Sequence, residues 1–146
     1  MLKGLLGNQI LWAALTAWLI AQVLKMFTSY YRTNKVDFQR LVGAGGMPSS
    51  HAALVVSLAM ATGWSRGFES VDFAIAVVMA GVVMYDASGV RQAAGKQAKV
   101  LNKLLQDLRQ HHTIPEVRLK ELLGHTPLEV IAGAVLGTVV AWLFCG

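Results

Sequence analysis

Long apolar stretches alternate with polar connections along the 146-residue chain. Four stretches predict membrane-spanning helices, and they cover about Asn8–Phe27, His51–Trp64, Val71–Tyr85 and Thr126–Phe144. Three of them are apolar on all helix faces rather than along one stripe, which favours lipid surroundings over a soluble core. His51–Trp64 is short for a span that needs ~20 residues. We therefore expect it to borrow flanking residues or to lie partly below the membrane surface.

The region after the third stretch predicts two further helices. Uncharged residues continue the third span to Val90, apart from Asp86, and leucines then follow helical spacing at positions 101, 104, 105 and 108. This pattern predicts that the third span continues into an amphipathic helix at the membrane interface, with its apolar face down. The segment His111–Pro115 breaks that helix, and a short helix is expected to follow, ending at Gly124.

Composition supports a membrane protein of one domain, residues 1–146. Apolar residues make up 55% of the chain and charged residues only 14%, whereas soluble domains have about 25% charged residues. A soluble all-helical bundle is the disfavoured alternative. The net charge is +5, but no basic stripe interleaved with aromatic residues indicates nucleic-acid binding. The single cysteine, Cys145, excludes an intrachain disulfide and a cysteine metal cluster.

The basic residues predict the orientation. Ten of the 13 lysines and arginines lie in two connections, residues 32–50 and 91–124. With four spans these connections fall on one side, which the positive-inside rule makes cytoplasmic. We therefore expect an integral protein of a bacterial-type inner or plasma membrane, with both termini outside. The apolar stretch behind Met1–Gly4 is long and lacks a clear cleavage site, so it is interpreted as a retained helix.

Ionisable residues gather near the cytoplasmic ends of the predicted spans. The small-residue turn Gly45–His51 opens the second span, and backbone N–H groups at such a helix start bind anions well. Lys25 and Arg32 are seven positions apart, so they share a helix face. His125 and Glu129 are one turn apart, which lets the carboxylate orient the imidazole. Together these groups predict one shared site facing the cytoplasm.

The same residues carry a family resemblance. Lys25 and Arg32, then Pro48-Ser49-Ser50-His51, then His125 and Glu129 followed by spaced glycines, resemble the three motifs of the type 2 phosphatidic acid phosphatase superfamily, in order. The whole chain resembles the small divergent branch of that superfamily, which is related to acid phosphatases and vanadium-dependent haloperoxidases. The run Met84–Arg91 also looks typical of this branch.

The resemblance implies a metal-independent phosphatase without a cofactor. His125 would attack phosphorus and form a phosphohistidine, Glu129 would hold its tautomer, and His51 would protonate the leaving alcohol. The substrate would be a lipid or isoprenoid phosphate monoester or pyrophosphate. The implied phosphate-binding residues are Lys25, Arg32, Gly46, Ser49, Ser50 and Arg91, and Asp86, Lys96 and Arg118 are supporting candidates.

Departures from the family pattern leave alternatives open. Leu119 stands where the third motif has an arginine, which Arg91 or Arg118 could replace, and Thr33, Ser50 and Glu129 also differ from the usual residues. The alternative function is a non-catalytic membrane protein that binds or transports a phosphorylated lipid or an anion. Whether the protein forms a homo-oligomer also stays open.

Several of these residues have a structural interpretation as well. Lys25 alone could be a snorkelling anchor, and His51 could be a helix-start residue without chemistry. Asp86 could have the structural role of neutralising Arg91 or Lys96, without a direct role in chemistry. The spacing of Gly133 and Gly137 favours close helix packing over catalysis.

Overall fold

The chain folds into helices around one central helix. The computed structural model describes residues 4, 6–33, 46–111 and 124–146, and these contain no strand. The long helices are α2 (Gln9–Thr33), α3 (Ser50–Arg66), α4 (Val71–Tyr85), α5 (Arg91–His111) and α6 (Pro127–Cys145), with the π-helix η2 (Asp86–Val90) between α4 and α5. The predicted all-α fold is confirmed, and each predicted apolar stretch forms a helix, with bounds close to those expected except that α2 continues six residues beyond Phe27 to Thr33.

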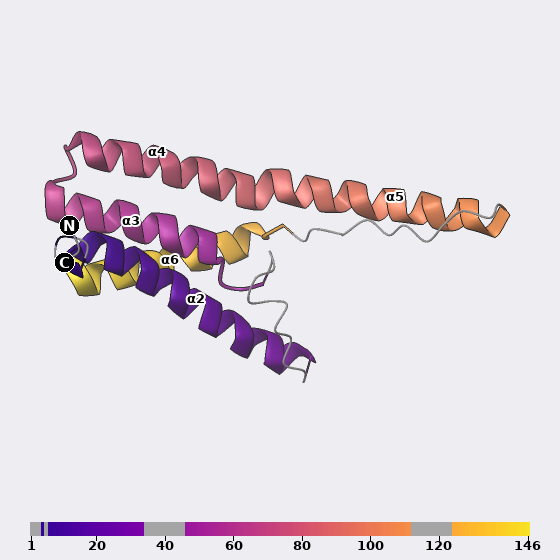
Figure 1. The fold of residues 1–146 in the computed structure, drawn as a ribbon, viewed down its shortest axis with the longest axis horizontal. Coiled ribbons are helices and arrows are strands. Elements are labelled where there is room, and N and C mark those ends of the chain that lie inside the picture. Colours follow the sequence, from indigo (N-terminus) through magenta and orange to yellow (C-terminus); the bar gives the residue numbers. More distant parts are fainter. Residues whose placement is uncertain (1–3, 5, 34–45, 112–123) are drawn as a thin grey trace.

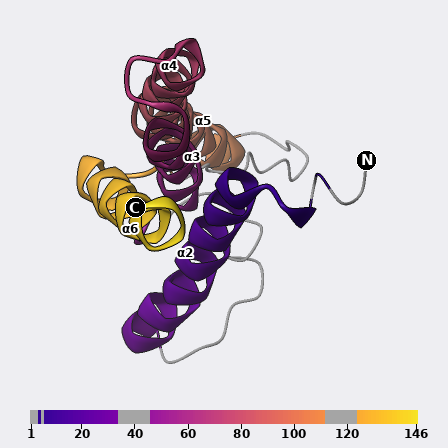
Figure 2. The same cartoon turned by 90° about the vertical axis from the view of Figure 1, so that its left-hand side faces the viewer.

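The bundle consists of α2, α3, α4 and α6, and successive helices of this set run in opposite directions (Figure 1). Helix α3 packs against α2, α4 and α6, and an end-on view places it among these three (Figure 2). One end of the bundle, here called the histidine end, gathers the end of α2 with the starts of α3 and α6. The opposite end, here called the tryptophan end, gathers the start of α2 with the ends of α3 and α6.

Small residues allow the close packing of these helices. The buried face of α3 consists mainly of alanine, serine and glycine, and it meets buried alanines of α2. Gly133 and Gly137 of α6 lie against the α3 backbone, where a Cβ atom on Gly137 would stand 2.5 Å from the carbonyl oxygen of Ala53. Small residues at helix contacts are typical of membrane proteins. The packing interpretation of this glycine pair is thus confirmed.

The outer faces of the bundle are strongly apolar. Large hydrophobic side chains are exposed along α2, α4 and α6. Within the part of the chain that the structure describes, three helical segments are long and apolar enough to cross a membrane, namely Gln9–Tyr31, Val71–Gln106 and Pro127–Cys145. The expectation was about four such spans, and the fourth, α3, does not meet this criterion of length and hydropathy. Helix α3 has only 17 residues, and because its neighbours cover it, it need not present an apolar surface to lipid.

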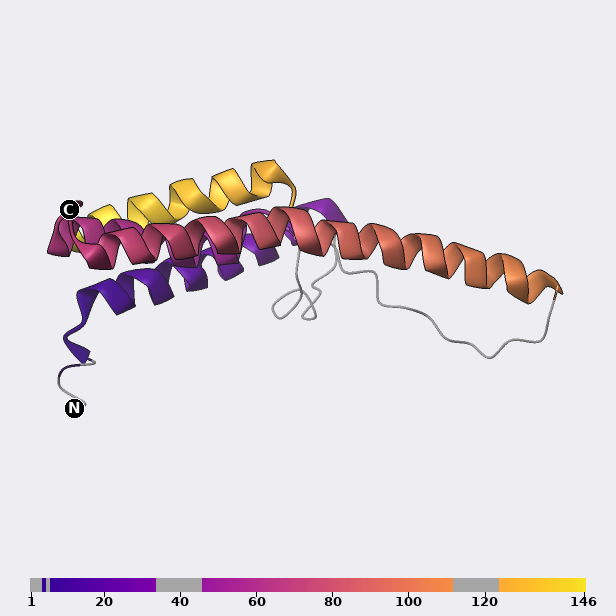
Figure 3. The ribbon, with the colours of Figure 1, turned by 90° about the horizontal axis from the view of Figure 1, so that it is seen from above.

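The third predicted span continues without interruption beyond the bundle. Helix α4 passes through η2 into α5, and α5 projects past the ends of the other helices (Figure 3). The predicted amphipathic continuation is thus confirmed as a helix, while its place at the membrane interface stays a prediction. The short helix expected before Gly124 lies outside the described residues.

Candidate active site

The alternating helix directions bring the predicted site residues to the histidine end. Lys25 lies two turns before the end of α2, and His51 lies in the first turn of α3. Asp86 begins η2, and His125 and Glu129 flank the start of α6. The expected convergence of ionisable groups from all four apolar segments is therefore a property of the fold.

Two histidines and a carboxylate form the centre of this cluster. The rings of His51 and His125 lie with their centroids 5.9 Å apart, at an interplanar angle of 65°. Nδ1 of His125 lies 3.2 Å from Oε2 of Glu129. A carboxylate can only accept at this contact, so it favours the tautomer with the proton on Nδ1 and the lone pair on Nε2. His125 is fully buried, at 0% exposure.

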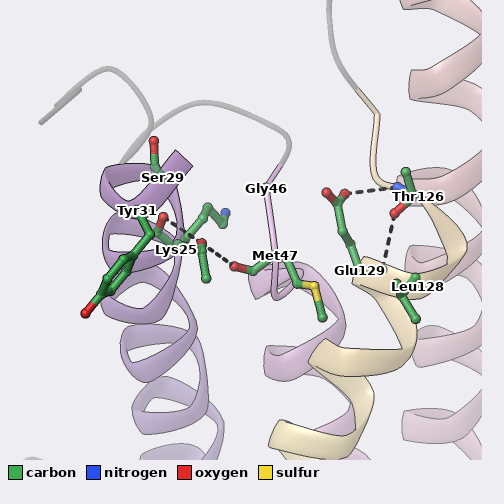
Figure 4. Close-up of a pocket in the computed structure, with 9 residues that line it drawn as sticks. Lys25, Ser29, Tyr31, Gly46, Met47, Thr126, Leu128 and Glu129 are labelled. Carbon is green, nitrogen blue, oxygen red and sulfur yellow. Dashed lines mark hydrogen bonds between the residues drawn. The ribbon is translucent and has the colours of Figure 1, made fainter. Parts of the chain in front are cut away.

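The cap of α6 fixes the position of the Glu129 carboxylate. Thr126 is the N-cap, and its hydroxyl accepts from the backbone N–H of Glu129 at 3.3 Å. The same carboxylate oxygen that meets His125 also accepts from the Thr126 backbone N–H at 3.0 Å (Figure 4). Sequence analysis missed this capping box, although the Thr126-x-x-Glu129 spacing with Pro127 between them is its usual signal.

The π-helix η2 holds the backbone of His125. The His125 N–H donates to the carbonyl oxygen of Ala87 at 2.9 Å, and Ala87 is buried. π-Bulges are often found at functional sites because they change which carbonyls are used within the helix. The unit that positions His125 therefore includes part of the run Met84–Arg91.

The turn before α3 is bound to both neighbouring helices. Gly46 has φ +94°, and a Cβ there would lie 2.9 Å from Cγ of Lys25. Ser49 is the N-cap of α3, where its hydroxyl accepts from the Ala52 N–H at 3.3 Å. Thr28 donates to the carbonyl oxygen of Met47 at 2.8 Å, a contact from α2 that sequence analysis missed. These bonds give the turn a fixed shape, and the phosphate contact expected of Ser49 stays a prediction.

Lys25 points into the protein. It is 3% exposed, and its Nζ donates to Oγ of Ser50 at 3.1 Å. A snorkelling lysine would extend its ammonium group to the membrane surface. The alternative interpretation as a snorkelling anchor is therefore wrong, and Lys25 brings a positive charge to the start of α3.

An open pocket of about 490 Å³ lies beside this cluster, between α2 and α6 (Figure 4). It is lined by one basic and one acidic side chain together with polar and apolar groups: Lys25, Thr28, Ser29, Tyr31, Gly46, Met47, Thr126, Leu128 and Glu129. The histidines are not among these lining residues. The pocket can thus receive an anion against Lys25, with Glu129 joining the pocket to His125.

The other predicted site residues have different positions. Asp86 is half-buried at the start of η2, whereas Lys96 is exposed on α5, about 15 Å further along the helix. Arg32 lies in the last turn of α2, and Arg91 is the first residue of α5. Arg118 and Leu119 lie outside the described residues. Among the described part of the chain, no group of three or more His, Cys, Asp or Glu side chains could hold a metal ion.

Comparison with known proteins identifies the family. A family model described as "Divergent PAP2 family" matches residues 6–140. The chain is 38% identical over 144 residues to the uncharacterized membrane protein YuiD of Bacillus subtilis (strain 168), and the match covers 91% of each chain. No solved structure matches the chain. Together with its apolar outer faces, these matches show that the chain is a helical membrane protein that belongs to the divergent PAP2 family.

Proposed function

We propose that this protein is a membrane-embedded phosphatase that hydrolyses a lipid or isoprenoid phosphate through a phosphohistidine on His125. The observation that carries this proposal is the contact of His125 Nδ1 with the Glu129 carboxylate, with the His51 ring 5.9 Å from the His125 ring. A nucleophile, a group that orients it and a second proton-transferring group are the minimum set for covalent phosphoryl transfer without a metal.

In the first step, Nε2 of His125 attacks phosphorus and the bond from phosphorus to the leaving oxygen breaks. His51, in its protonated form, gives its proton to that oxygen, so the alcohol or phosphate leaves with its oxygen protonated. In the second step, His51 removes a proton from a water molecule, which attacks the phosphohistidine. Phosphate is released and both histidines return to their starting states.

Lys25 supplies positive charge for the phosphate oxygens. Lys25 lines the pocket and its ammonium group already contacts Ser50, so the side chain is positioned before a ligand arrives. Charge-assisted hydrogen bonds of this kind are stronger than neutral ones. Arg32 and Arg91 are proposed as further phosphate ligands, and Arg91 or Arg118 would replace the third-motif arginine, whose position is occupied by Leu119.

Aromatic residues support a site at the headgroup level. Tyr30, Tyr31 and Tyr85 are exposed at the histidine end, and Trp12 and Trp142 are exposed at the tryptophan end. Trp12 and Tyr31 are separated by about 28 Å of helix, close to the ~30 Å thickness of a bilayer core. Tryptophan and tyrosine favour both membrane interfaces. A phosphate at the histidine end would therefore sit where lipid headgroups lie, and the basic connections favour the cytoplasmic leaflet.

The burial of His125 favours a second candidate function. A protein that only binds or transports a phosphorylated lipid or anion needs the pocket and Lys25, and it does not need an accessible His125. His125 is fully buried and does not line the pocket. In this alternative, Glu129 and His125 would be structural groups that cap α6.

A phosphate-release screen decides between a phosphatase and a protein that only binds or transports its ligand. The purified protein in lipid nanodiscs would be offered lipid and isoprenoid phosphates, with His125→Ala and His51→Ala as matched variants. We expect turnover by the wild type, an acid-labile phosphoprotein that accumulates in His51→Ala, and neither signal in His125→Ala. Full turnover in both variants would refute the mechanism. Tight phosphate or vanadate binding by the wild type without turnover across the panel would establish the second candidate.

A further inference from the structure

Helix α5 presents an apolar face outside the bundle. Leu101 and Leu104 are 48% and 52% exposed, and Val100 and Leu108 are also exposed. The helix projects beyond α2, α3 and α6 (Figure 3). An exposed apolar face of this length marks a contact with a membrane or another protein.

The two faces of α5 are sharply separated. At 100° per residue, the apolar residues from Ala93 to Leu108 fall within an arc of about 160°, interrupted only by Gln97. Lys96, Lys99 and Lys103 lie on the opposite side, and all three are exposed. A broad apolar arc facing a lysine-rich face is the pattern of helices that lie in a membrane interface.

We infer that α5 binds the anionic surface of the leaflet at the histidine end, with its apolar arc among the upper acyl chains. Charge favours this partner, because the sequence of α5 contains five basic residues and one acidic residue. Each lysine or arginine near an anionic surface adds to the attraction. The inference does not depend on the proposed phosphatase activity.

A second copy of the chain fits this face less well. Pairing two α5 helices would bring two strongly basic helices together, where like charges repel. The apolar arc is also wider than the narrow seam of a two-helix coiled coil. An anionic membrane surface can bury the whole apolar arc among its acyl chains and attract the basic residues with its headgroups.

The position of α5 along the chain brings it to the leaflet. It begins directly after η2, six residues beyond the exposed Tyr85, and therefore near the interface of the membrane that α4 crosses. In the structure α5 continues the direction of α4 (Figure 3). Lying on the leaflet requires a bend, and Gly89 in η2 and Gly95 in α5 stand at this junction. Glycines and π-bulges are where helices kink.

The test uses the full chain with Cys145→Ser, carrying one environment-sensitive fluorophore on Leu104→Cys or on Lys103→Cys. Both proteins are reconstituted into vesicles of phosphatidylcholine alone and into vesicles with equal parts of phosphatidylglycerol. In the anionic vesicles we expect blue-shifted emission and quenching by brominated lipid at position 104, and a water-like signal at position 103. Adding Lys99→Gln and Lys103→Gln to the Leu104→Cys protein should lower the ratio of docked to undocked α5 roughly 30-fold. Arg66→Gln, at the tryptophan end, should leave that ratio unchanged.

Two results would overturn the inference. In the first, the label at position 104 stays water-like in anionic vesicles. In the second, it is shielded equally in both lipids, with energy transfer between differently labelled proteins that grows with protein density. The second result would assign the face to another copy of the chain.

Discussion

The backbone N–H of Ser49 donates to the carbonyl oxygen of Glu129 at 2.9 Å. This bond joins the N-cap of α3 to the first turn of α6, two segments far apart in the sequence. Gly133, one turn further along α6, has no side chain, so the Ser49 carbonyl can lie directly against it. The second and third family motifs thus form one rigid unit, and this unit brings the rings of His51 and His125 together.

Glu129→Gln tests whether the carboxylate acts on His125. Glutamine keeps the capping-box geometry at this position, but it removes the charge that stabilises a histidine protonated on Nδ1. We expect turnover to fall at least about 10²-fold with little change in melting temperature, as measured by phosphate release and thermal unfolding in nanodiscs.

Thr126→Ala is the matched control for that prediction. It removes the cap hydroxyl and leaves the Glu129 carboxylate, so it should lower stability by about 1 kcal/mol while turnover persists. Equal loss of turnover in both variants, in proportion to their unfolding, would show that Glu129 only caps α6.

Gly133→Ala should destabilise the bundle. A Cβ at this position would collide with the Ser49 carbonyl oxygen, which is backbone and cannot rotate away. We expect a loss of about 1–3 kcal/mol, measured as a lower unfolding midpoint. Gly81→Ala on α4 is the control, because a Cβ there meets nothing within 4 Å, and no loss is expected. Equal midpoints for the two variants would contradict the packing described for α3 and α6.

Lys25→Met should weaken anion binding. It keeps the length of the side chain but removes the ammonium group that contacts Ser50 and lines the pocket. Hydrogen bonds to charged groups contribute about 1.5–3 kcal/mol, so the vanadate concentration for half-maximal binding should rise roughly 10- to 150-fold. Arg66→Gln, which removes a positive charge at the opposite end of the bundle, should leave binding unchanged. Unaltered vanadate binding by a folded Lys25→Met protein would remove Lys25 from the site.

Ala87→Leu should disturb His125 through the backbone. Ala87 is buried, and its carbonyl oxygen accepts from the His125 N–H. A larger side chain would push η2 away from α6, so we expect lower turnover than in Gly89→Ala. At Gly89 a Cβ would make only ordinary contact, 3.9 Å from the Tyr85 ring. A folded Ala87→Leu protein with wild-type turnover would show that η2 does not position the histidine.

Cysteine labelling tests the orientation. In a Cys145→Ser background, Glu69→Cys lies in the connection between α3 and α4, at the tryptophan end, and Lys99→Cys lies on α5 beyond the histidine end. The positive-inside rule predicts that an impermeant thiol reagent labels position 69 in intact cells and position 99 only after permeabilisation. The reverse pattern would place the site on the outer face.

The sequence predicts the elements of this fold well, because the signals for them are local. Apolar runs predict α3, α4 and α6 within about two residues and the start of α2, and the polar residues that interrupt these runs identify the ends at which ionisable groups gather. The sequence predicts the number of membrane-spanning helices less well. Helix α3 has an apolar sequence, but only the tertiary structure shows that other helices surround it. It therefore does not need the length of a helix that faces lipid.

The positions of some site residues could likewise be predicted from the sequence, and those of others could not. His125 and Glu129 are four positions apart, so their contact could be predicted from spacing, but His125 precedes α6 and the cap at Thr126 fixes the carboxylate that it meets. The inward path of Lys25 depends on Gly46, which leaves room for its side chain. The His125 contact to Ala87 uses a backbone carbonyl, and a carbonyl has no signature in the sequence.

What the sequence determined by itself was therefore the helices, the basic connections and the residue types available for phosphate chemistry. Only the tertiary structure decided that His125 is buried, that Glu129 joins it to the pocket and that α3 is the centre of the bundle. The physical reason is that helix periodicity acts over one or two turns. Burial and contact between distant segments depend instead on how closely whole helices approach, which small residues such as Gly133 permit.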